Sequence, residues 1–431
     1  MSKPDTPYRK RALGDRALSP ETLMMSYGFD AKMSEGSIKP PVFLTSTFAF
    51  ATAEEGAAYF RIMGGKKEAG DPETAGLLYS RFNNPNMEVL EDRLAVFEGA
   101  EDALVFSSGM GAISTVLMAH SRAGDVILQS TPLYGGTETL IRSILPQYGI
   151  ASADFFAGAS EEEIRKVVDA ALDKGRISVL YCETPTNPTN EVVDLKLMAK
   201  LADEIGERQG HRPPVVVDNT ILGPIGHKPL ELGGDIVVYS LTKYIGGHSD
   251  LIGGAALGKS DQMLPVRKLR SGMGTNLDPH TCWMLARSLE TVTLRMRAAF
   301  EGARKVAEYL RDHPKVKKVR YLGFLEEGTR DYEVHKRQSG DMHGSTFAFD
   351  VEGGQDAAFR MLNALKVAKL AVSLGGTETL ICHPGSTTHA AVDKELQARL
   401  GFDPGMVRVS IGVENPDDLI ADFEQALAVL T

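Results

Sequence analysis

Lys243 is the residue of this sequence best suited to covalent chemistry. It lies in the stretch SLTKY, directly after the apolar run 236–239, and has the hydroxyl residues Ser240 and Thr242 beside it. A lysine in a crowded loop at the end of a strand is partly desolvated, which lowers the pKa of its amine and favours the neutral, nucleophilic form. We therefore expect Lys243 to form a Schiff base. The alternative is an ordinary surface lysine.

Three further loops that follow predicted strands carry residues suited to the same chemistry. Residues 107–111 (SSGMG) join a strand to a helix, and the N–H groups at a helix start can hold a phosphate. Tyr134 opens the next helix and can stack on a flat ring, while Asp218 ends the strand in VVVDNT and can pair with a protonated ring nitrogen. Each has a structural alternative: a tight turn for 107–111, a core aromatic for Tyr134 and a turn cap for Asp218.

Together these residues predict a site for pyridoxal phosphate (PLP). This cofactor needs a lysine for the Schiff base, an acidic partner for the pyridine nitrogen and a cradle for the phosphate. Other motifs are missing: the sequence has no GxxxxGK[ST], HExxH or GxSxG. The SxxK match at 240–243 lacks the SDN and KTG partners of β-lactamases, and the ten histidines show no metal-ligand spacing, so we expect no metal.

Short apolar runs alternate with helical patterns from Ala103 onward, which predicts an α/β fold. Strands that are apolar on both faces and separated by helices form a mostly parallel central sheet with helices on both faces. Ligands bind such sheets at the carboxyl ends of the strands, where the four loops lie. The predicted strands are 103–106, 126–128, 179–182, 215–217 and 236–239, and the predicted helices are 112–121, 161–172 and 195–205. Asn84-Pro85 predicts an earlier helix start.

The remaining sequence predicts a smaller C-terminal α/β domain. One long helix is expected over 281–312, followed by strand, helix, strand and helix over 345–351, 355–364, 407–411 and 417–430. The expected division is an N-terminal arm and loop (1–70), a PLP-binding domain (71–280) and a C-terminal domain (281–431). The arm either is solvated or packs on a partner subunit. The Gly- and charge-rich stretch 61–76 is predicted to be a loop.

Composition narrows the class of protein. The chain has 431 residues, 43% of them apolar, and a net charge of −10. The negative charge argues against nucleic acid as a partner. No stretch approaches the ~20 apolar residues of a membrane span, so no membrane association is expected. Three cysteines without a CxxC motif indicate a reducing compartment, and we expect a cytoplasmic enzyme with a small-molecule substrate.

Long motifs across residues 40–431 resemble one family of PLP enzymes. The chain is similar to the cystathionine γ-synthase / methionine γ-lyase family, the Cys/Met-metabolism branch of fold-type-I PLP-dependent enzymes. The resemblance implies the PLP-dependent transferase fold. The stretches that carry it are YSRFNNPN (79–86), SSGMGA (107–112), LYGGT (133–137), ETPTNP (183–188), VVVDNT (215–220), SLTKYIGGHSD (240–250), SLGGTETL (373–380), HPGSTTH (383–389) and VRVSIGVE (407–414).

The resemblance implies a role for each matching residue at the cofactor. Lys243 matches the Schiff-base lysine and general acid/base, and Asp218 matches the partner of the ring nitrogen. Tyr134 matches the aromatic residue that stacks on the ring and helps to move protons, and Asn187 matches the contact to the ring hydroxyl. The phosphate ligands within the subunit are Gly109, Met110, Ser240 and Thr242.

Other matches imply a shared site and a substrate anchor. Tyr79 and Arg81 resemble residues that reach the phosphate of the neighbouring subunit, so a homodimer with shared sites, and a homotetramer overall, are implied. Ser373 and Arg408 match residues that hold the substrate carboxylate. A planar guanidinium suits that task because it binds a carboxylate through two parallel hydrogen bonds.

The implied reaction takes place at the γ-carbon of a sulfur amino acid. Methionine γ-lyase-like elimination gives a 2-oxo acid, ammonia and a thiol. The alternative is γ-replacement on an O-acylhomoserine, as in cystathionine γ-synthases and O-acylhomoserine sulfhydrylases. Val372 resembles the methionine γ-lyases, whereas Gly136 stands where those lyases carry a cysteine, and their Lys-Asp pair near Gly274 is missing.

Overall fold

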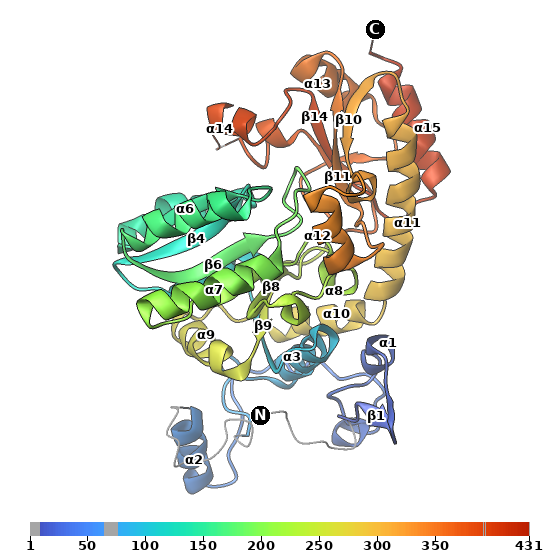
Figure 1. The fold of residues 1–431 in the computed structure, drawn as a ribbon. Helices are drawn as coiled ribbons and strands as arrows, with labels where there is room; N and C mark the ends of the chain where they lie inside the picture. Colours follow the sequence, from blue (N-terminus) through green and yellow to red (C-terminus); the bar gives the residue numbers. More distant parts are fainter. Residues whose placement is uncertain (1–8, 64–75, 391, 393, 431) are drawn as a thin grey trace.

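A seven-stranded sheet, a five-stranded sheet and their surrounding helices make up most of the described part of the protein, and two short strands near the N-terminus form a third sheet (Figure 1). The computed structural model describes residues 9–63, 76–390, 392 and 394–430. The larger sheet and its helices occupy the middle of the chain, and the smaller sheet lies above it in Figure 1. The predicted α/β class is confirmed, while the exact domain boundaries at 70 and 280 stay a prediction.

The larger sheet places the carboxyl ends of most of its strands at one edge. Its strands, in spatial order, are β3 (Asp102–Phe106), β9 (Gly254–Gly258), β8 (Ile236–Ser240), β7 (Val215–Asp218), β6 (Arg176–Glu183), β4 (Asp125–Thr131) and β5 (Ala151–Phe156). Strands β4 to β8 pair in parallel, whereas β9 is antiparallel to both neighbours. All strands of this sheet except β9 therefore point their carboxyl ends to the same edge, as the mostly parallel prediction requires.

Helices cover both faces of the larger sheet. They are α3 (Pro85–Glu98), α4 (Gly109–His120), α5 (Gly135–Thr139), α6 (Glu161–Leu172), α7 (Leu195–Gln209), α8 (Gly223–Gly226), α9 (Ser260–Met273) and α10 (Pro279–Leu289). Helices α3, α6, α7 and α10 pack against one face, and α4 and α9 against the other. Asn84 caps α3 and Pro85 occupies its first turn, as the sequence predicts.

The smaller sheet is mainly antiparallel. Its order is β10 (Val316–Arg320), β11 (Thr346–Val351), β14 (Met406–Ser410), β13 (Leu380–Cys382) and β12 (Lys369–Leu370). Only β12 and β13 of this sheet pair in parallel. The helices in the same part of the chain are α12 (Arg330–Ser339), α13 (Gly354–Ala364), α14 (Lys394–Arg399) and α15 (Pro416–Leu427). Helices α13 and α15 share its core.

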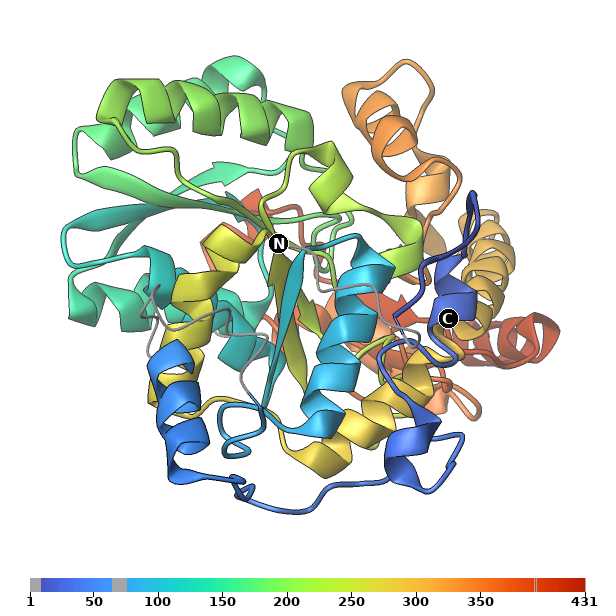
Figure 2. The same ribbon diagram turned by 90° about the horizontal axis from the view of Figure 1, so that it is seen from below.

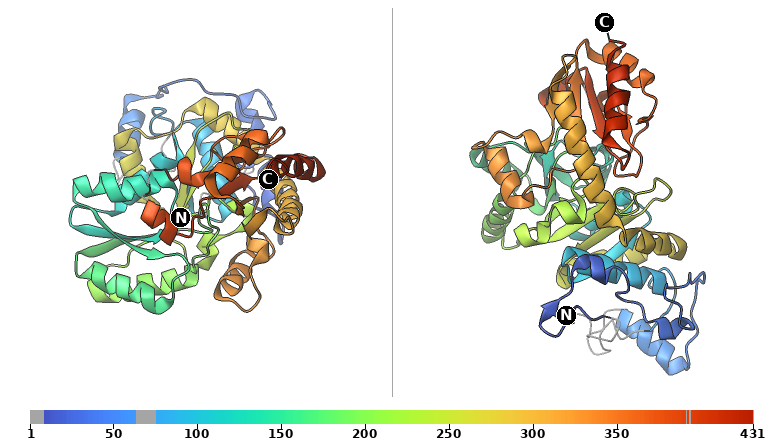
Figure 3. Two further views of the ribbon diagram at one scale, coloured as in Figure 1. Left: turned by 90° about the horizontal axis from the view of Figure 1, so that it is seen from above. Right: turned by 90° about the vertical axis from the view of Figure 1, so that its right-hand side faces the viewer.

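The single helix expected over 281–312 is in fact two helices, so that prediction is wrong. Helix α10 ends at Leu289, and α11 (Val292–Arg311) begins after Glu290 and Thr291. Thr291 leaves the helical conformation, with φ −114° and ψ 5°. Helix α11 then runs from the core of the larger sheet to that of the smaller one, as the right-hand view of Figure 3 shows.

The N-terminal segment extends along one side of the molecule. It contains β1 (Ala12–Leu13), β2 (Arg16–Ala17), α1 (Pro20–Leu23) and α2 (Ala53–Met63). Figure 2 shows α1 and α2 at opposite ends of a long connection. The loop predicted from residue 61 is helical as far as Met63, and its residues 64–75 lie outside the described part of the chain.

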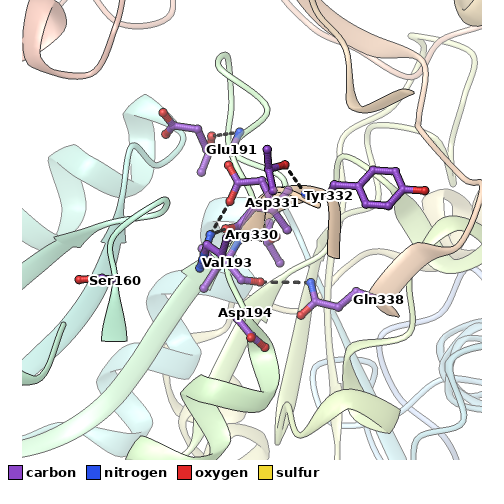
Figure 4. A network of polar contacts seen from close by, with 12 residues as sticks. Ser160, Glu191, Val193, Asp194, Arg330, Asp331, Tyr332 and Gln338 are labelled. Carbon is purple, nitrogen blue, oxygen red and sulfur yellow. Dashed lines mark hydrogen bonds and ion pairs between the residues drawn. The ribbon is translucent and has the colours of Figure 1, made fainter. Parts of the chain in front are cut away.

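A polar network fastens the segment after β6 to α12 (Figure 4). The side-chain amide of Gln338 donates to the carbonyl of Val193 at 3.1 Å, and its oxygen accepts the N–H of Leu195 at 2.8 Å. Arg330 Nη1 donates to the carbonyl of Val192 at 2.8 Å. Because the same segment carries Asn187, the network helps to fix a predicted site residue.

Candidate active site

Lys243 lies in a turn that follows β8 and points its amine at the smaller sheet. Its Nζ donates a hydrogen bond to Ser373 Oγ at 2.9 Å. Burial, and then the charge of Arg408, lower the pKa of the Lys243 amine to about 8, while Asp218 acts in the opposite direction. A substantial neutral fraction of this amine therefore exists near neutral pH, as a nucleophile or base requires.

Asp218 ends β7, the strand next to β8. Its Oδ1 accepts the backbone N–H of Thr220 at 3.0 Å, and its Oδ2 accepts the Tyr181 hydroxyl at 3.3 Å. Burial raises the pKa of the Asp218 carboxyl. One oxygen of Asp218 therefore caps the following turn, as the alternative interpretation expected. The side chain nevertheless lines the same cavity as Lys243. A buried carboxylate there would be stabilised by a cationic partner.

Glu183 is a site residue that the sequence reasoning did not single out. It ends β6, and its two carboxyl oxygens accept the backbone N–H groups of Tyr134 (2.7 Å) and Asn187 (3.0 Å). Burial, and then the charge of Asp218, raise the pKa of Glu183. This carboxyl ties two predicted site residues together. Its place in ETPTNP, directly after an apolar strand, was the available signal.

The predicted phosphate cradle lies at the start of α4. Ser108 caps the helix by accepting the N–H of Gly111 at 3.0 Å, and the first backbone bond runs from Ala112 N to Ser108 O at 3.1 Å. The N–H groups of Gly109 and Met110 precede that bond and so are available to a ligand. A Cβ at Gly109 would lie 3.0 Å from the Ser240 Cβ, so any larger residue here would push the two loops slightly apart.

Arg408 in β14 faces the lysine turn from the smaller sheet. Its Nη2 donates to the carbonyl of Ser373 at 2.7 Å, and its Nη1 donates to Asn187 Oδ1 at 3.4 Å. The residue is 2% exposed, and its buried Nε has no hydrogen-bond partner in the described residues. A buried guanidinium with an unused donor fits a carboxylate ligand. Ser373 has φ +151°, a conformation that non-glycine residues rarely adopt.

Tyr79 and Arg81 lie away from the other predicted site residues of the same chain. Tyr79 is 43% exposed. Arg81 Nη1 donates to the carbonyl of Ser271 at 2.5 Å, and its guanidinium lies 4.4 Å from the ring centre of Phe82. Neither residue lines the cavity that holds Lys243. Their predicted contact to a phosphate therefore depends on a second chain.

One cavity of about 310 Å³ collects the other predicted residues. Those that line it are Gly109, Met110, Tyr134, Asn187, Asp218, Ser240, Thr242, Lys243, Ser373 and Arg408. Its donor set fits PLP: helix N–H groups for a phosphate, a buried carboxyl for the ring nitrogen and an amine of lowered pKa for the aldehyde. Arg408 Nε has no partner among the described residues.

The lowered pKa of Lys243 predicts how the cofactor-free chain takes up PLP. The neutral amine is the reactive form, so the uptake rate should rise with pH and reach half its maximum near pH 8. The visible absorbance gained after mixing gives this rate. An unperturbed lysine, with its pKa of 10.5, would place the midpoint more than two pH units higher, and such a result would contradict the burial of the amine.

Neither a metal centre nor a membrane-spanning helix is present among the described residues. Within residues 9–63, 76–390, 392 and 394–430, no group of histidine, cysteine or acidic side chains could hold a metal ion. None of the described helices is both long enough and apolar enough to cross a membrane. Cys182, Cys282 and Cys382 are buried free thiols.

Known proteins resemble this chain over nearly its whole length. The family model for the Cys/Met metabolism PLP-dependent enzyme matches residues 21–428. L-methionine gamma-lyase from Fusobacterium nucleatum subsp. polymorphum is 38% identical, over 97% of this chain and 98% of the relative. O-succinylhomoserine sulfhydrylase from Pseudomonas aeruginosa is 34% identical, over 95% of each chain. A cystathionine gamma-lyase structure from Lactobacillus plantarum matches with a TM-score of 0.82 and 32% identity, over 95% of this chain and 99% of that chain.

The family match and the cavity agree, because the cavity offers the groups that PLP requires. The prediction of the family, the fold and the cofactor from sequence is confirmed. This chain belongs to the Cys/Met-metabolism family of PLP-dependent enzymes.

Proposed function

We propose that this enzyme catalyses γ-elimination of methionine-like amino acids to a 2-oxo acid, ammonia and a thiol. The chemistry of the cavity carries the proposal. Lys243, Asp218 and Arg408 supply a base, a ring-nitrogen partner and a carboxylate anchor. Aliphatic side chains complete the wall: Ile113, Ile221, Ile252, Val372 and Leu374. Asp218 and Glu183 are the only acids among the described residues that line it, and both are already hydrogen-bonded, so none of these residues offers a free carboxylate to a second ammonium. The similarity to L-methionine gamma-lyases supports this choice.

The proposed roles follow from the position of each residue. When bound, PLP supplies an electron sink for the charge that develops at the substrate α-carbon. Arg408 binds the α-carboxylate and so orients the α C–H bond towards Lys243. Lys243 Nζ, held by Ser373, takes the α-proton, and Tyr134 helps to move protons between the α- and β-carbons. Asp218 keeps a proton on the pyridine nitrogen.

Replacement at the γ-carbon of an O-acylhomoserine is the second candidate function. Gly136, where methionine γ-lyases typically carry a cysteine, favours it. The similarity to an O-succinylhomoserine sulfhydrylase also supports it. Both functions use the same base, ring-nitrogen partner and carboxylate anchor, and they differ in the γ-substituent and in whether a thiol enters.

A substrate panel separates the two functions. The purified enzyme with PLP would be given methionine, homocysteine, cystathionine or an O-acylhomoserine at equal concentration, the last with and without a thiol. Release of 2-oxobutanoate and ammonia would measure elimination, and formation of a new sulfur amino acid with release of the acyl group as a carboxylic acid would measure replacement. We expect methionine, which is a thioether, and homocysteine, which is a thiol, to be turned over fastest. Product from an O-acylhomoserine only in the presence of a thiol would replace the lyase proposal with the replacement reaction.

Val372 provides a direct test of the uncharged wall. Cystathionine brings a second ammonium, which would be partly desolvated beside the apolar Val372 without a partner, so cystathionine should bind less well than methionine. Val372 is 56% exposed, so Val372→Glu should add a partly solvated ion pair. We expect it to raise kcat/KM for cystathionine relative to methionine by roughly fivefold. Val372→Gln is the control, because glutamine has nearly the same shape as glutamate without its charge. An equal rise in that control would refute the electrostatic argument.

A homodimer with shared sites is the proposed assembly, and a homotetramer the proposed complete form. The support is the position of Tyr79 and Arg81 outside the cavity of their own chain, together with their match to phosphate ligands of a neighbouring subunit. We also propose a cytoplasmic location, which the three free thiols support.

Mixed dimers test whether the sites are shared. Arg81→Ala should weaken PLP binding, because a charged hydrogen bond to phosphate contributes about 1.5–3 kcal/mol. A dimer of one Arg81→Ala chain and one Lys243→Ala chain contains one site with both residues intact. Such dimers, isolated with two different affinity tags, should recover up to half of the wild-type activity. Inactive mixed dimers, or a fully active monomer, would refute the shared site.

A further inference from the structure

Arg295 is a cation that no acidic side chain of the described residues neutralises. It lies in the first turn of α11 and is half-buried. Within the described part of the chain, no carboxylate forms an ion pair with it. Its guanidinium instead donates to the carbonyls of Tyr244 (2.7 Å), Ile245 (3.2 Å) and Ser288 (2.9 Å), and its Nε donates to Thr291 Oγ1 (3.2 Å). These bonds use most of the N–H donors of the arginine, but all of the acceptors are neutral oxygens.

Two of these carbonyls belong to the turn that carries Lys243. The turn is closed by bonds from Gly246 N to Leu241 O and from Gly247 N to Lys243 O, both 2.7 Å. As at the end of a helix, the last carbonyls, those of Tyr244 and Ile245, have no partner within the turn. Arg295 provides that partner, since its side chain spans both oxygens.

Two glycines show how tightly this arrangement is packed. A Cβ at Gly247 would lie 1.8 Å from Arg295 Nη1, and Gly247 has φ +69°. On the other side, a Cβ at Gly375 would lie 2.7 Å from Tyr244 N, and Gly375 has φ +72°. Side chains at these positions would displace either the guanidinium or the turn. The Lys243 turn is therefore held between Arg295 and the segment that follows Ser373.

Helix α11, which carries Arg295, is buried in both cores of the molecule. Its first half, including Phe300, packs in the core of the larger sheet, and its second half packs in the core of the smaller sheet (Figure 3). Phe300 also meets Tyr244 edge to face, with ring centres 6.3 Å apart. Arg295 thus connects the Lys243 turn to the element that joins both halves of the site.

We propose that Arg295 is a positioning residue for Lys243: it caps the lysine turn and thereby holds Nζ at the buried position beside Ser373 and Arg408. The proposal rests on the function proposed above only in so far as Lys243 is the reactive amine. Without the cap, the turn can relax and expose Nζ to water. The pKa of Lys243 should then rise from about 8 towards its ordinary value of 10.5, because the burial that lowers it is lost.

The test compares Arg295→Met with Arg297→Met. Arg297 lies on the same helix, is 66% exposed and has only a 3.8 Å ion pair with Glu21, so it is the matched control. The first readout is the pH midpoint for PLP uptake by the cofactor-free chain, which requires no turnover. We expect Arg295→Met to raise this midpoint by at least one pH unit and Arg297→Met to leave it unchanged. If Arg295→Met fails to fold, Arg295→Lys is used and should give a smaller rise.

The second readout is catalysis by the PLP-loaded enzyme. A displaced lysine should lower kcat roughly 10- to 100-fold while KM changes less than about twofold, because substrate anchoring by Arg408 is untouched. An unchanged midpoint in the Arg295 variant, or an equal rise in both variants, would overturn the proposal. Failure of the wild-type enzyme to cleave thioethers would instead affect only the proposed function, since the midpoint is measured without substrate.

Gly247→Ala offers an independent test of the same contact. Its methyl group would displace the guanidinium and strain the backbone at φ +69°. The strain and a 3.0 Å approach to Tyr244 O are the same in wild-type and Arg295→Met backgrounds, whereas the clash with the guanidinium exists only in the first. Gly247→Ala should therefore raise the midpoint in the wild-type background and add little to Arg295→Met. Equal effects in both backgrounds would show that the contact does not position Lys243.

Discussion

Replacing Lys243 with alanine should abolish turnover while the protein still binds PLP without a covalent bond. The amine is the proposed base, and its removal should lower kcat by roughly 10²–10⁴-fold or more. The helix start at Gly109 and the carboxyl of Asp218 remain, so the phosphate and the ring nitrogen keep their proposed partners. Absorbance spectra before and after dialysis, together with 2-oxo acid release, would measure both effects.

Lys259→Ala is the control for this experiment. Lys259 is an exposed lysine directly after β9 and does not line the cavity. Its replacement should leave the spectrum and the turnover rate unchanged. A Lys243→Ala protein that kept wild-type activity, or a wild-type protein that gained no visible absorbance with PLP, would refute the assignment of the reactive amine.

The fold could be predicted wherever the sequence is regular. The predicted strands and helices from 103 to 239 correspond to β3, β4, β6, β7 and β8 with α4, α6 and α7, because each has an apolar run or a helical period. Strand β9 was missed because GAALG contains no β-branched residue. Its small residues are a tertiary requirement: a Cβ at Gly254 would lie 2.1 Å from Ser108 O, and one at Gly258 would lie 2.5 Å from Asp235 O.

The break between α10 and α11 has a similar explanation. Residues 281–312 have a nearly continuous helical period, and neither glycine nor proline marks the stop at Glu290 and Thr291. The break is stabilised by Arg295, which donates to the carbonyl of Ser288 and to the hydroxyl of Thr291. A contact that depends on a folded side chain leaves no local signal in the sequence.

The site could be predicted only in part, because some of its residues depend on contacts with distant segments of the chain. Residues at or just beyond the carboxyl ends of apolar strands, such as Asp218 and Lys243, can be recognised because ligands bind parallel sheets at these ends. Glu183 has the same position, but its role depends on backbone N–H groups from two other loops. Arg408 was expected only through family resemblance, since β14 belongs to a different sheet and lies far along the chain.

Arg408→Lys should be the second most damaging single change at the site. The guanidinium now donates to Ser373 O and Asn187 Oδ1 and keeps Nε free, whereas an ammonium cannot make the same planar set of bonds. Loss of a charged hydrogen bond costs about 1.5–3 kcal/mol, which corresponds to roughly 10- to 150-fold in kcat/KM. We expect most of this loss in KM, because the substrate carboxylate is the group that loses its anchor.

A neutral replacement at the same position separates charge from shape. The charge of Arg408 lowers the pKa of Lys243, so Arg408→Met should raise that pKa and shift PLP uptake to higher pH, while Arg408→Lys should leave the midpoint near 8. Arg320→Lys is the control, because Arg320 lies on the edge strand β10 of the same sheet and pairs with Asp350 instead of lining the cavity. Equal KM values in the Arg408 variants and wild type would exclude Arg408 as the carboxylate anchor. The midpoint is measured without substrate, so it would still report whether the guanidinium charge reaches the lysine.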